Sequence, residues 1–231
     1  MSEPLVVILG VGTGIGKTHV ACSMLAWAAA NGIPLSAYKP IESGPRGIGD
    51  RTDAMRLADA NMFHVKPPAT LHFDAPLAPT LAAALQSQRI PTPAITSTIQ
   101  KLRRKSALLL ELPGAAFSPF DAELSNAHYV AMHPDANIVL VLPNELGVLS
   151  DAMAYTMALG TLNLRPSLFL LNTPRHADAS TSRNHLDLRD RFPYVTIASL
   201  TRGDAAHVSS SLPQQWMRTT LSPDSTSKRR R

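Results

Sequence analysis

The chain has 231 residues, of which 45% are hydrophobic and 17% are charged, so it can bury the core of one α/β domain. Its net charge is +5, but the last four residues, Lys228 to Arg231, contribute four of these positive charges, and the rest of the chain is nearly neutral. A nearly neutral body in which only 5% of the residues are aromatic argues against a protein that binds single-stranded nucleic acid.

Cysteine content and hydropathy bear on the compartment. Cys22 is the only cysteine, so no intramolecular disulfide can form, as is typical of a reducing cytosol. No apolar run approaches the roughly 20 residues that cross a bilayer, and the N-terminus has no basic stretch that leads into a signal-type core. We therefore expect a cytoplasmic protein whose domain spans residues 1–221, followed by a basic, disordered tail at residues 222–231.

The first predicted strand and helix enclose a glycine-rich loop. Residues 5–9 are all apolar, as in a strand buried on both faces, and the alanine-rich stretch 19–30 favours a helix. Lys17 would bind the terminal phosphates of a nucleotide, and the Thr18 hydroxyl would bind Mg²⁺. Four glycines let the intervening backbone turn its N–H groups toward phosphate oxygens, namely Gly10, Gly12, Gly14 and Gly16.

The glycine-rich loop is longer than the usual phosphate loop. Counting back from Gly16, the usual pattern has its first glycine at position 11, where this chain has Val11. Gly10 lies one residue further out. The spacing therefore narrows the family of phosphate-loop proteins to which the chain can belong.

Further strands alternate with helices along the chain. We expect strands at residues 35–38, 107–111, 137–142, 167–171 and 195–198, and helices at 52–61 (with Thr52 as N-cap), 81–88, 94–104, 149–162 and 181–191. This alternation predicts a single-domain α/β fold, a P-loop three-layer sandwich with a mostly parallel sheet and helices on both faces. In such folds the ligand lies beyond the carboxyl ends of the strands.

Polar side chains follow several of the predicted strands. Lys39 and Ser43 come after the second strand, Glu111 ends the strand at 107–111, and Asn172 follows the strand at 167–171. Beside a nucleotide, Lys39 would join Lys17 in neutralising the charge of a transferring phosphoryl group. A carboxylate directly after three leucines must be paired or must bind a cation, because an unpaired buried charge is costly.

An oxygen-ligand set for Mg²⁺ can be assembled from these residues. Thr18, Asp53 and Glu111 offer a hydroxyl and two carboxylates, which phosphates and water would complete. Asp50 is the alternative to Asp53. We prefer Asp53 because it starts a helix, whereas Asp50 follows a glycine-rich segment.

Taken in order, these motifs resemble those of the ATP-dependent dethiobiotin synthetases, enzymes of the biotin pathway that close a ureido ring. The resemblance spans about residues 5–200. The similar segments are the long phosphate loop (10–18), Lys-Pro-x-x-Ser-Gly (39–44), the aspartate segment (52–54), the Glu-Gly-Ala-Gly-Gly loop with its downstream proline (111–119), the Leu-Gly pair (146–147) and the strand-end Asn172.

The resemblance implies a reaction in which 7,8-diaminopelargonate takes up CO₂ as a carbamate. The carbamate oxygen attacks the γ-phosphate of ATP, and the second amine closes on the carbamic-phosphoric anhydride. In this scheme Lys17 and Lys39 are the catalytic residues, Thr13 and Ser43 bind the carbamate, and Thr18, Asp53 and Glu111 hold Mg²⁺. This chemistry needs positioning and charge neutralisation more than a protein nucleophile.

The resemblance also implies binding sites for the nucleotide and the substrate. The family is homodimeric, with the substrate site shared across the interface, and backbone amides at a helix start hold the distal carboxylate of the substrate. Here those substrate-binding amides are Gly147, Val148, Leu149 and Ser150. The ATP-binding residues are Gly12, Thr13, Gly14, Ile15, Gly16, Lys17, Thr18, Asp53, Glu111, Gly114, Asn172 and Thr173.

The chain departs from the family pattern at several positions. Leu112 and Pro113 stand where the family has Gly-Ala, and Pro113 has no N–H to donate. Ala115 replaces a glycine, and Ser150 replaces the usual asparagine. A polar pair early in the phosphate loop is replaced by Val11 and Gly12. A homologue with an altered substrate or weakened activity therefore remains an alternative.

Three other functions agree less well with the sequence. A nucleotide-switched partition or positioning ATPase has an extra lysine at the start of the phosphate loop, where this chain has Gly10-Val11-Gly12. A GTP-dependent switch needs a lysine and an aspartate that the segment after Asn172 lacks. An amide ligase of the cobyrinate type usually has a glutaminase domain, which this chain does not have.

Overall fold

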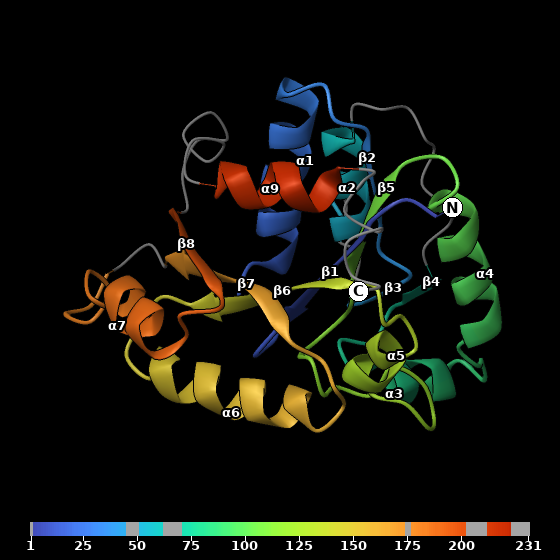
Figure 1. Cartoon of the computed structure of the whole chain (residues 1–231). Coiled ribbons are helices and arrows are strands. Elements are labelled where there is room, and N and C mark those ends of the chain that lie inside the picture. The colour runs from blue at the N-terminus through green and yellow to red at the C-terminus, as the bar shows by residue number, and fades with distance from the viewer. Residues whose placement is uncertain (1, 45–50, 62–70, 174–176, 202–211, 223–231) are drawn as a thin grey trace.

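The core of the protein is a six-stranded parallel sheet (Figure 1). The computed structural model describes residues 2–44, 51–61, 71–173, 177–201 and 212–222. The strands lie in the order β2-β5-β1-β6-β7-β8, and each neighbouring pair is parallel. Their bounds are β1 (Leu5–Gly10), β2 (Leu35–Tyr38), β5 (Ala107–Glu111), β6 (Asn137–Pro143), β7 (Pro166–Thr173) and β8 (Thr196–Thr201).

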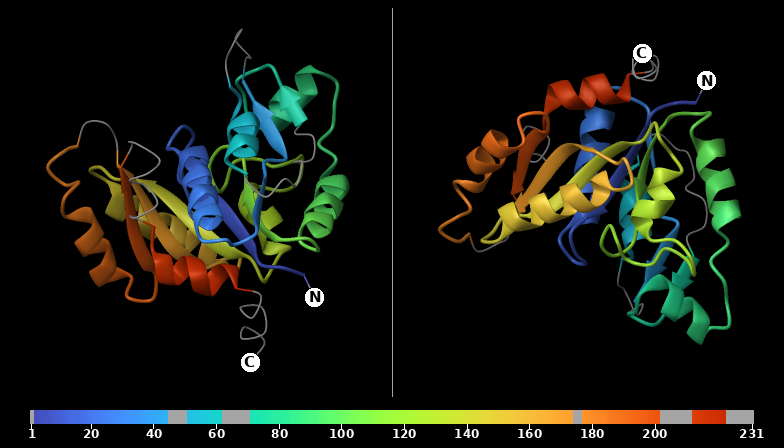
Figure 2. Two further views of the ribbon diagram at one scale, coloured as in Figure 1. Left: turned by 90° about the horizontal axis from the view of Figure 1, so that it is seen from above. Right: turned by 60° about the horizontal axis from the view of Figure 1, so that its bottom comes forward.

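Helices cover both faces of this sheet. One face packs against α1 (Lys17–Ala30), α2 (Asp53–Ala60) and α9 (Gln214–Leu221). The other packs against α4 (Thr92–Leu102), α5 (Asn126–Ala131), α6 (Val148–Gly160) and α7 (Asn184–Arg191). Figures 1 and 2 show α6 on the side of the sheet opposite α1 and α9. The predicted α/β class with a three-layer arrangement is confirmed.

The central strand β1 shows why two hydrophobic cores form. Its residues alternate in direction, so Val6 and Ile8 pack with the α1 face while Val7 and Leu9 pack with the α6 face. All of β1 is buried. A strand covered on both sides must be apolar at every position, which is why it reads as an unbroken hydrophobic run.

Several short elements were not predicted. β3 (Ile41–Ser43) and β4 (Leu71–Phe73) form a second, two-stranded parallel sheet, and three residues are too few to show a period. The helices α5 and α9 were also missed. A signal for α5 was present, because Ser125 caps it by accepting a hydrogen bond from the His128 N–H.

The ends of the predicted elements differ from those observed by a few residues. α1 begins at Lys17, inside the glycine-rich loop, and α7 begins at Asn184 instead of residue 181. The short helix predicted at 81–88 is α3 (Pro79–Leu85), with proline in its first turn. Residues 223–231 of the predicted tail, like Asp50, lie outside the described residues. Within the described ranges, every helix is too short or too polar to cross a membrane.

A buried arginine connects the end of α4 to the residues that precede two strands of the sheet. Arg103, directly after α4, is buried, and its Nε donates to the Glu3 carbonyl at 2.8 Å. Its guanidinium also binds the Asp135 carboxylate, which precedes β6. This contact lowers the pKa of Asp135, although partial burial of the carboxyl opposes it. Arg103 therefore fastens the entries of β1 and β6 to the end of α4.

Replacing Arg103 with methionine should lower the free energy of unfolding by about 1–3 kcal/mol, because the variant loses two charge-assisted contacts. Urea unfolding measures the change. Arg104→Met, at the exposed neighbouring position, should change the stability by less than about 0.5 kcal/mol. Equal unfolding midpoints for the two variants would contradict the role given to Arg103.

Candidate functional site

The glycine-rich loop borders a cavity of about 600 Å³ at the carboxyl end of the sheet. The loop connects β1 to α1, so its N–H groups lie at the N-terminus of a helix of 14 residues. The cavity is lined by Thr13, Gly14, Gly16, Lys17, Thr18, His19, Lys39, Glu42, Ser43, Asp53, Arg56, Glu111, Pro113 and Gly114. Residues predicted from separate parts of the chain thus meet at one site.

The loop conformation depends on glycine at the helix start. Gly16 is the N-cap of α1 with φ of 96°, a left-handed conformation that L side chains rarely adopt. A Cβ atom at this position would lie 2.1 Å from Nδ2 of Asn172. Asn172 in turn donates from Nδ2 to the Ile15 carbonyl at 2.6 Å, and this hydrogen bond connects β7 to the loop. That Asn172 binds ATP stays a prediction.

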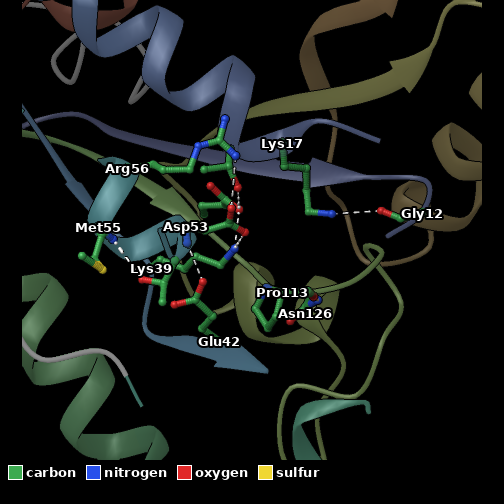
Figure 3. Close-up of polar contacts among 12 residues, drawn as sticks. Gly12, Lys17, Lys39, Glu42, Asp53, Met55, Arg56, Pro113 and Asn126 are labelled. Carbon is green, nitrogen blue, oxygen red and sulfur yellow. Dashed lines mark hydrogen bonds and ion pairs between the residues drawn. The ribbon is translucent and has the colours of Figure 1, made fainter. Parts of the chain in front are cut away.

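Lys17 is held over the loop that precedes it. Its Nζ donates to the Gly12 carbonyl at 2.9 Å, and the side chain is buried (Figure 3). Burial lowers the pKa of Lys17 to about 8, although the Glu111 carboxylate acts in the opposite direction. A phosphate in the cavity would replace part of the water that this ammonium has lost.

Lys39 joins two carboxylates at the floor of the cavity. Its Nζ lies 2.8 Å from Oε1 of Glu111 and 2.5 Å from Oδ2 of Asp53. Glu111 is only 1% exposed, and its Oε1 also accepts from the Thr18 hydroxyl at 2.8 Å. Burial alone would lower the pKa of Lys39, but the two carboxylates outweigh it and raise the pKa. Lys39 is therefore a cation at neutral pH.

Several residues that line the cavity were missed by sequence analysis, and two of them contact Asp53. Glu42 lines the cavity, and its Oε1 accepts from the Asp53 N–H at 2.6 Å, which fixes the start of α2. Arg56, one turn into α2, lies 3.5 Å from the Asp53 carboxylate. Lys39 binds the side chain of Asp53, and Glu42 accepts from the main-chain N–H of Asp53. The position of Asp53 therefore depends on both ends of the Lys-Pro-Ile-Glu segment (Figure 3).

The residues at the cavity floor fit a hard cation such as Mg²⁺. Thr18, Asp53 and Glu111 supply only oxygen atoms, as Mg²⁺ prefers. Oε2 of Glu111 is buried and has no hydrogen-bond partner among the described residues, so it is an acceptor in need of a ligand. The described residues contain no cluster of three or more His, Cys, Asp or Glu suited to a metal. Phosphate and water would have to complete the coordination.

Other predicted site residues lie outside the cavity or have their side chains engaged in other contacts. Gly147 to Ser150 form the start of α6 and do not line the cavity. Ser43 lines it, but its hydroxyl donates to the Leu77 carbonyl at 2.8 Å. Thr173 accepts a hydrogen bond from Asn144 instead of lining the cavity. α6 is nevertheless tied to the glycine-rich loop, because the Tyr155 hydroxyl donates to the Val11 carbonyl at 2.7 Å.

The segment after β5 borders the cavity at Pro113 and Gly114. Asn126 at the start of α5 donates from Nδ2 to the Pro113 carbonyl at 2.6 Å and to the Ala115 carbonyl at 2.8 Å. The Ala116 N–H donates to the Gly10 carbonyl at 2.8 Å. The segment that departs from the family pattern is therefore held between α5 and the glycine-rich loop.

Comparisons with known proteins concern the family and the fold. A family model described as an AAA domain matches residues 5–212. The ATP-dependent dethiobiotin synthetase BioD of Anaeromyxobacter sp. (strain Fw109-5) is 32% identical over 176 residues, which cover 74% of this chain and 77% of that protein. The enzyme of the same name from Caulobacter sp. (strain K31) is 27% identical over 179 residues, covering 73% and 76%.

Solved structures support the fold. The signal recognition particle receptor FtsY from Elizabethkingia anophelis, in complex with GDP, has a TM-score of 0.52 and 12% identity. The match covers 91% of this chain and 64% of that chain, so this chain spans just under two thirds of the receptor's length. At this identity the likeness concerns the fold alone.

Glu111→Gln should weaken Mg²⁺-dependent nucleotide binding by at least about tenfold, because an amide keeps the shape and accepts from Lys39 but loses the charge that a divalent cation needs. Calorimetric titration of ATP with and without Mg²⁺ measures the effect. Glu42→Gln is the matched control, since the glutamine oxygen can still accept from the Asp53 N–H. An unchanged Mg²⁺ requirement in Glu111→Gln would remove Glu111 from the metal site.

Proposed function

This chain belongs to the ATP-dependent dethiobiotin synthetase family, and we propose that it closes the ureido ring of dethiobiotin from 7,8-diaminopelargonate, CO₂ and ATP. The observation that carries the proposal is the meeting of a phosphate loop, two buried lysines and two carboxylates around one cavity. Such a site can bind a triphosphate and neutralise the charge of a transferring phosphoryl group.

The lysines have separate tasks in this proposal. Lys17, at the start of α1, neutralises the terminal phosphates of ATP. Lys39 follows β2 and stabilises the oxygen of the carbamate as it attacks the γ-phosphorus, from which ADP departs. Thr13 and Ser43 line the same cavity and orient the carbamate. The second amine of the substrate then attacks the carbonyl carbon of the carbamic-phosphoric anhydride, and the bond to the phosphate oxygen breaks.

Magnesium would be held by Thr18, Asp53 and Glu111, and it would supply charge neutralisation to the β- and γ-phosphates. The chain contributes positioning. Glu111 binds both the Thr18 hydroxyl and Lys39, so a change at any of the three displaces the others. The hydrogen bond from the Asp53 N–H to Glu42 keeps the Asp53 carboxylate within reach of Lys39.

The distal carboxylate of the substrate would bind the amides at the start of α6 in a second copy of the chain. Gly147 to Ser150 lie away from the cavity of their own chain, so a homodimer with a shared substrate site suits their position. Leu146, just before α6, is 84% exposed, and Met157, on α6, is 71% exposed. Exposed large apolar side chains of this kind favour an interface. We place the enzyme in the cytoplasm, where Cys22 would stay reduced.

Lys17→Ala and Lys39→Ala should each lower phosphate release from ATP, in the presence of bicarbonate and 7,8-diaminopelargonate, by at least about 100-fold. Each removes a cation from the cavity, whereas Lys101→Ala changes an exposed lysine of α4 and should leave the rate unchanged. Circular dichroism would show that all three variants fold.

Omission of the diamine separates this function from a nucleotide-switched ATPase. The proposed ligase releases phosphate only when bicarbonate and the diamine are both present. Equal phosphate release by the unaltered protein with and without the diamine would reject the proposal, and full turnover by either lysine variant would reject the role of that lysine.

A further inference from the structure

The side chain of Asn126 sets the direction of two peptide groups beside the cavity. Asn126 is 1% exposed, and its Nδ2 donates to the carbonyls of both Pro113 and Ala115. In a planar trans peptide, the carbonyl oxygen and the following N–H point in opposite directions. Because each of these two carbonyls points toward Asn126, the N–H of the same peptide group points away from Asn126.

The second of these peptide groups shows the effect directly. The Ala115 carbonyl accepts from Asn126, and the N–H of the same peptide group, that of Ala116, donates to the Gly10 carbonyl at 2.8 Å. This peptide unit thus extends from α5 to the start of the glycine-rich loop. The geometry is that expected from a planar peptide with both ends hydrogen-bonded.

The first peptide group, between Pro113 and Gly114, borders the cavity. Its carbonyl accepts from Asn126 on the buried side at 2.6 Å, so the Gly114 N–H is directed away from Asn126. Pro113 and Gly114 both line the cavity (Figure 3 shows Pro113 beside Asn126). The Gly114 N–H thus points away from Asn126 and belongs to a residue that lines the cavity.

The Gly114 N–H differs from the N–H groups that follow it in its hydrogen bonding. Pro113 has no N–H, the Ala115 N–H donates to the Ser118 hydroxyl at 2.9 Å, and the Ala116 N–H is used by Gly10. Within the described part of the chain, the Gly114 N–H has no hydrogen-bond acceptor. Only glycine fits, because φ is +70° and a Cβ atom would lie 2.6 Å from Oγ of Ser118.

We propose that Asn126 is a positioning residue that aims the Gly114 N–H at an oxyanion in the cavity and so replaces the amide that Pro113 cannot supply. The inference rests on the proposed function, in which Gly114 already binds ATP, and adds to it the support of the Gly114 N–H by Asn126. Two oxyanions share this chemistry, the γ-phosphate of ATP and the carbamate of the substrate.

Asn126→Ala tests the proposal, because it frees the peptide group without changing a cavity-lining residue. A γ-phosphate contact predicts that the Kd of Mg·ATP rises about tenfold while that of Mg·ADP is unchanged. A carbamate contact predicts unchanged nucleotide affinities and a KM for 7,8-diaminopelargonate that rises about tenfold. Asn137→Ala is the control, since Asn137 is also buried but lies where β6 begins, at the opposite end of the sheet.

Unchanged ATP affinity and unchanged KM in a folded Asn126→Ala variant would overturn the proposal, as would equal losses in Asn126→Ala and Asn137→Ala. If Asn126→Ala does not fold, nuclear magnetic resonance of the unaltered protein replaces it. The Gly114 amide proton should then shift downfield with Mg·ATP or with the diamine and bicarbonate, and no shift with either would also overturn the proposal. Failure of diamine-dependent turnover in the unaltered protein would instead count against the proposed function.

Discussion

The buried ion pair between Lys39 and Glu111 is the constraint on which the site depends. Glu111 ends a strand that is covered on both faces, so its charge must be paired where it lies. Lys39 comes from the neighbouring strand β2, and Asp53 comes from the first turn of α2. One ammonium group therefore joins three elements at the same edge of the sheet. The sheet order places these residues side by side, since β5 lies between β1 and β2.

Neutral side chains hold the loops around this charged centre. Asn172 supports the phosphate loop from β7, Asn126 holds the segment after β5, and Tyr155 ties α6 to Val11. Each donates to a main-chain carbonyl and so fixes the course of a loop at the site. A site arranged in this way needs little reorganisation when an anion binds, and such preorganisation is a large part of electrostatic catalysis.

Much of the fold could be predicted because its central strands are buried on both faces and are therefore continuous apolar runs. The strand ends also located Lys39 and Glu111 before any coordinates, because parallel strands end at one edge, and Asp53 was chosen because it starts a helix. Glu42 and Asn126 could not be found in this way. Their roles come from hydrogen bonds to the main chain of residues 11 to 13 positions away, which leave no periodic pattern in the sequence. β3 and β4 escaped prediction because three residues carry too little pattern.

The two tryptophans lie in one layer of the molecule. Trp27 is buried in α1 beneath α9, with the Arg218 guanidinium 5.6 Å from its ring centre, and Trp216 on α9 packs against the same core. Ten helical residues, or about 15 Å, separate Trp27 from Lys17. Intrinsic tryptophan fluorescence consequently monitors whether the C-terminal helix is docked, and it is a poor optical signal for events in the phosphate cavity.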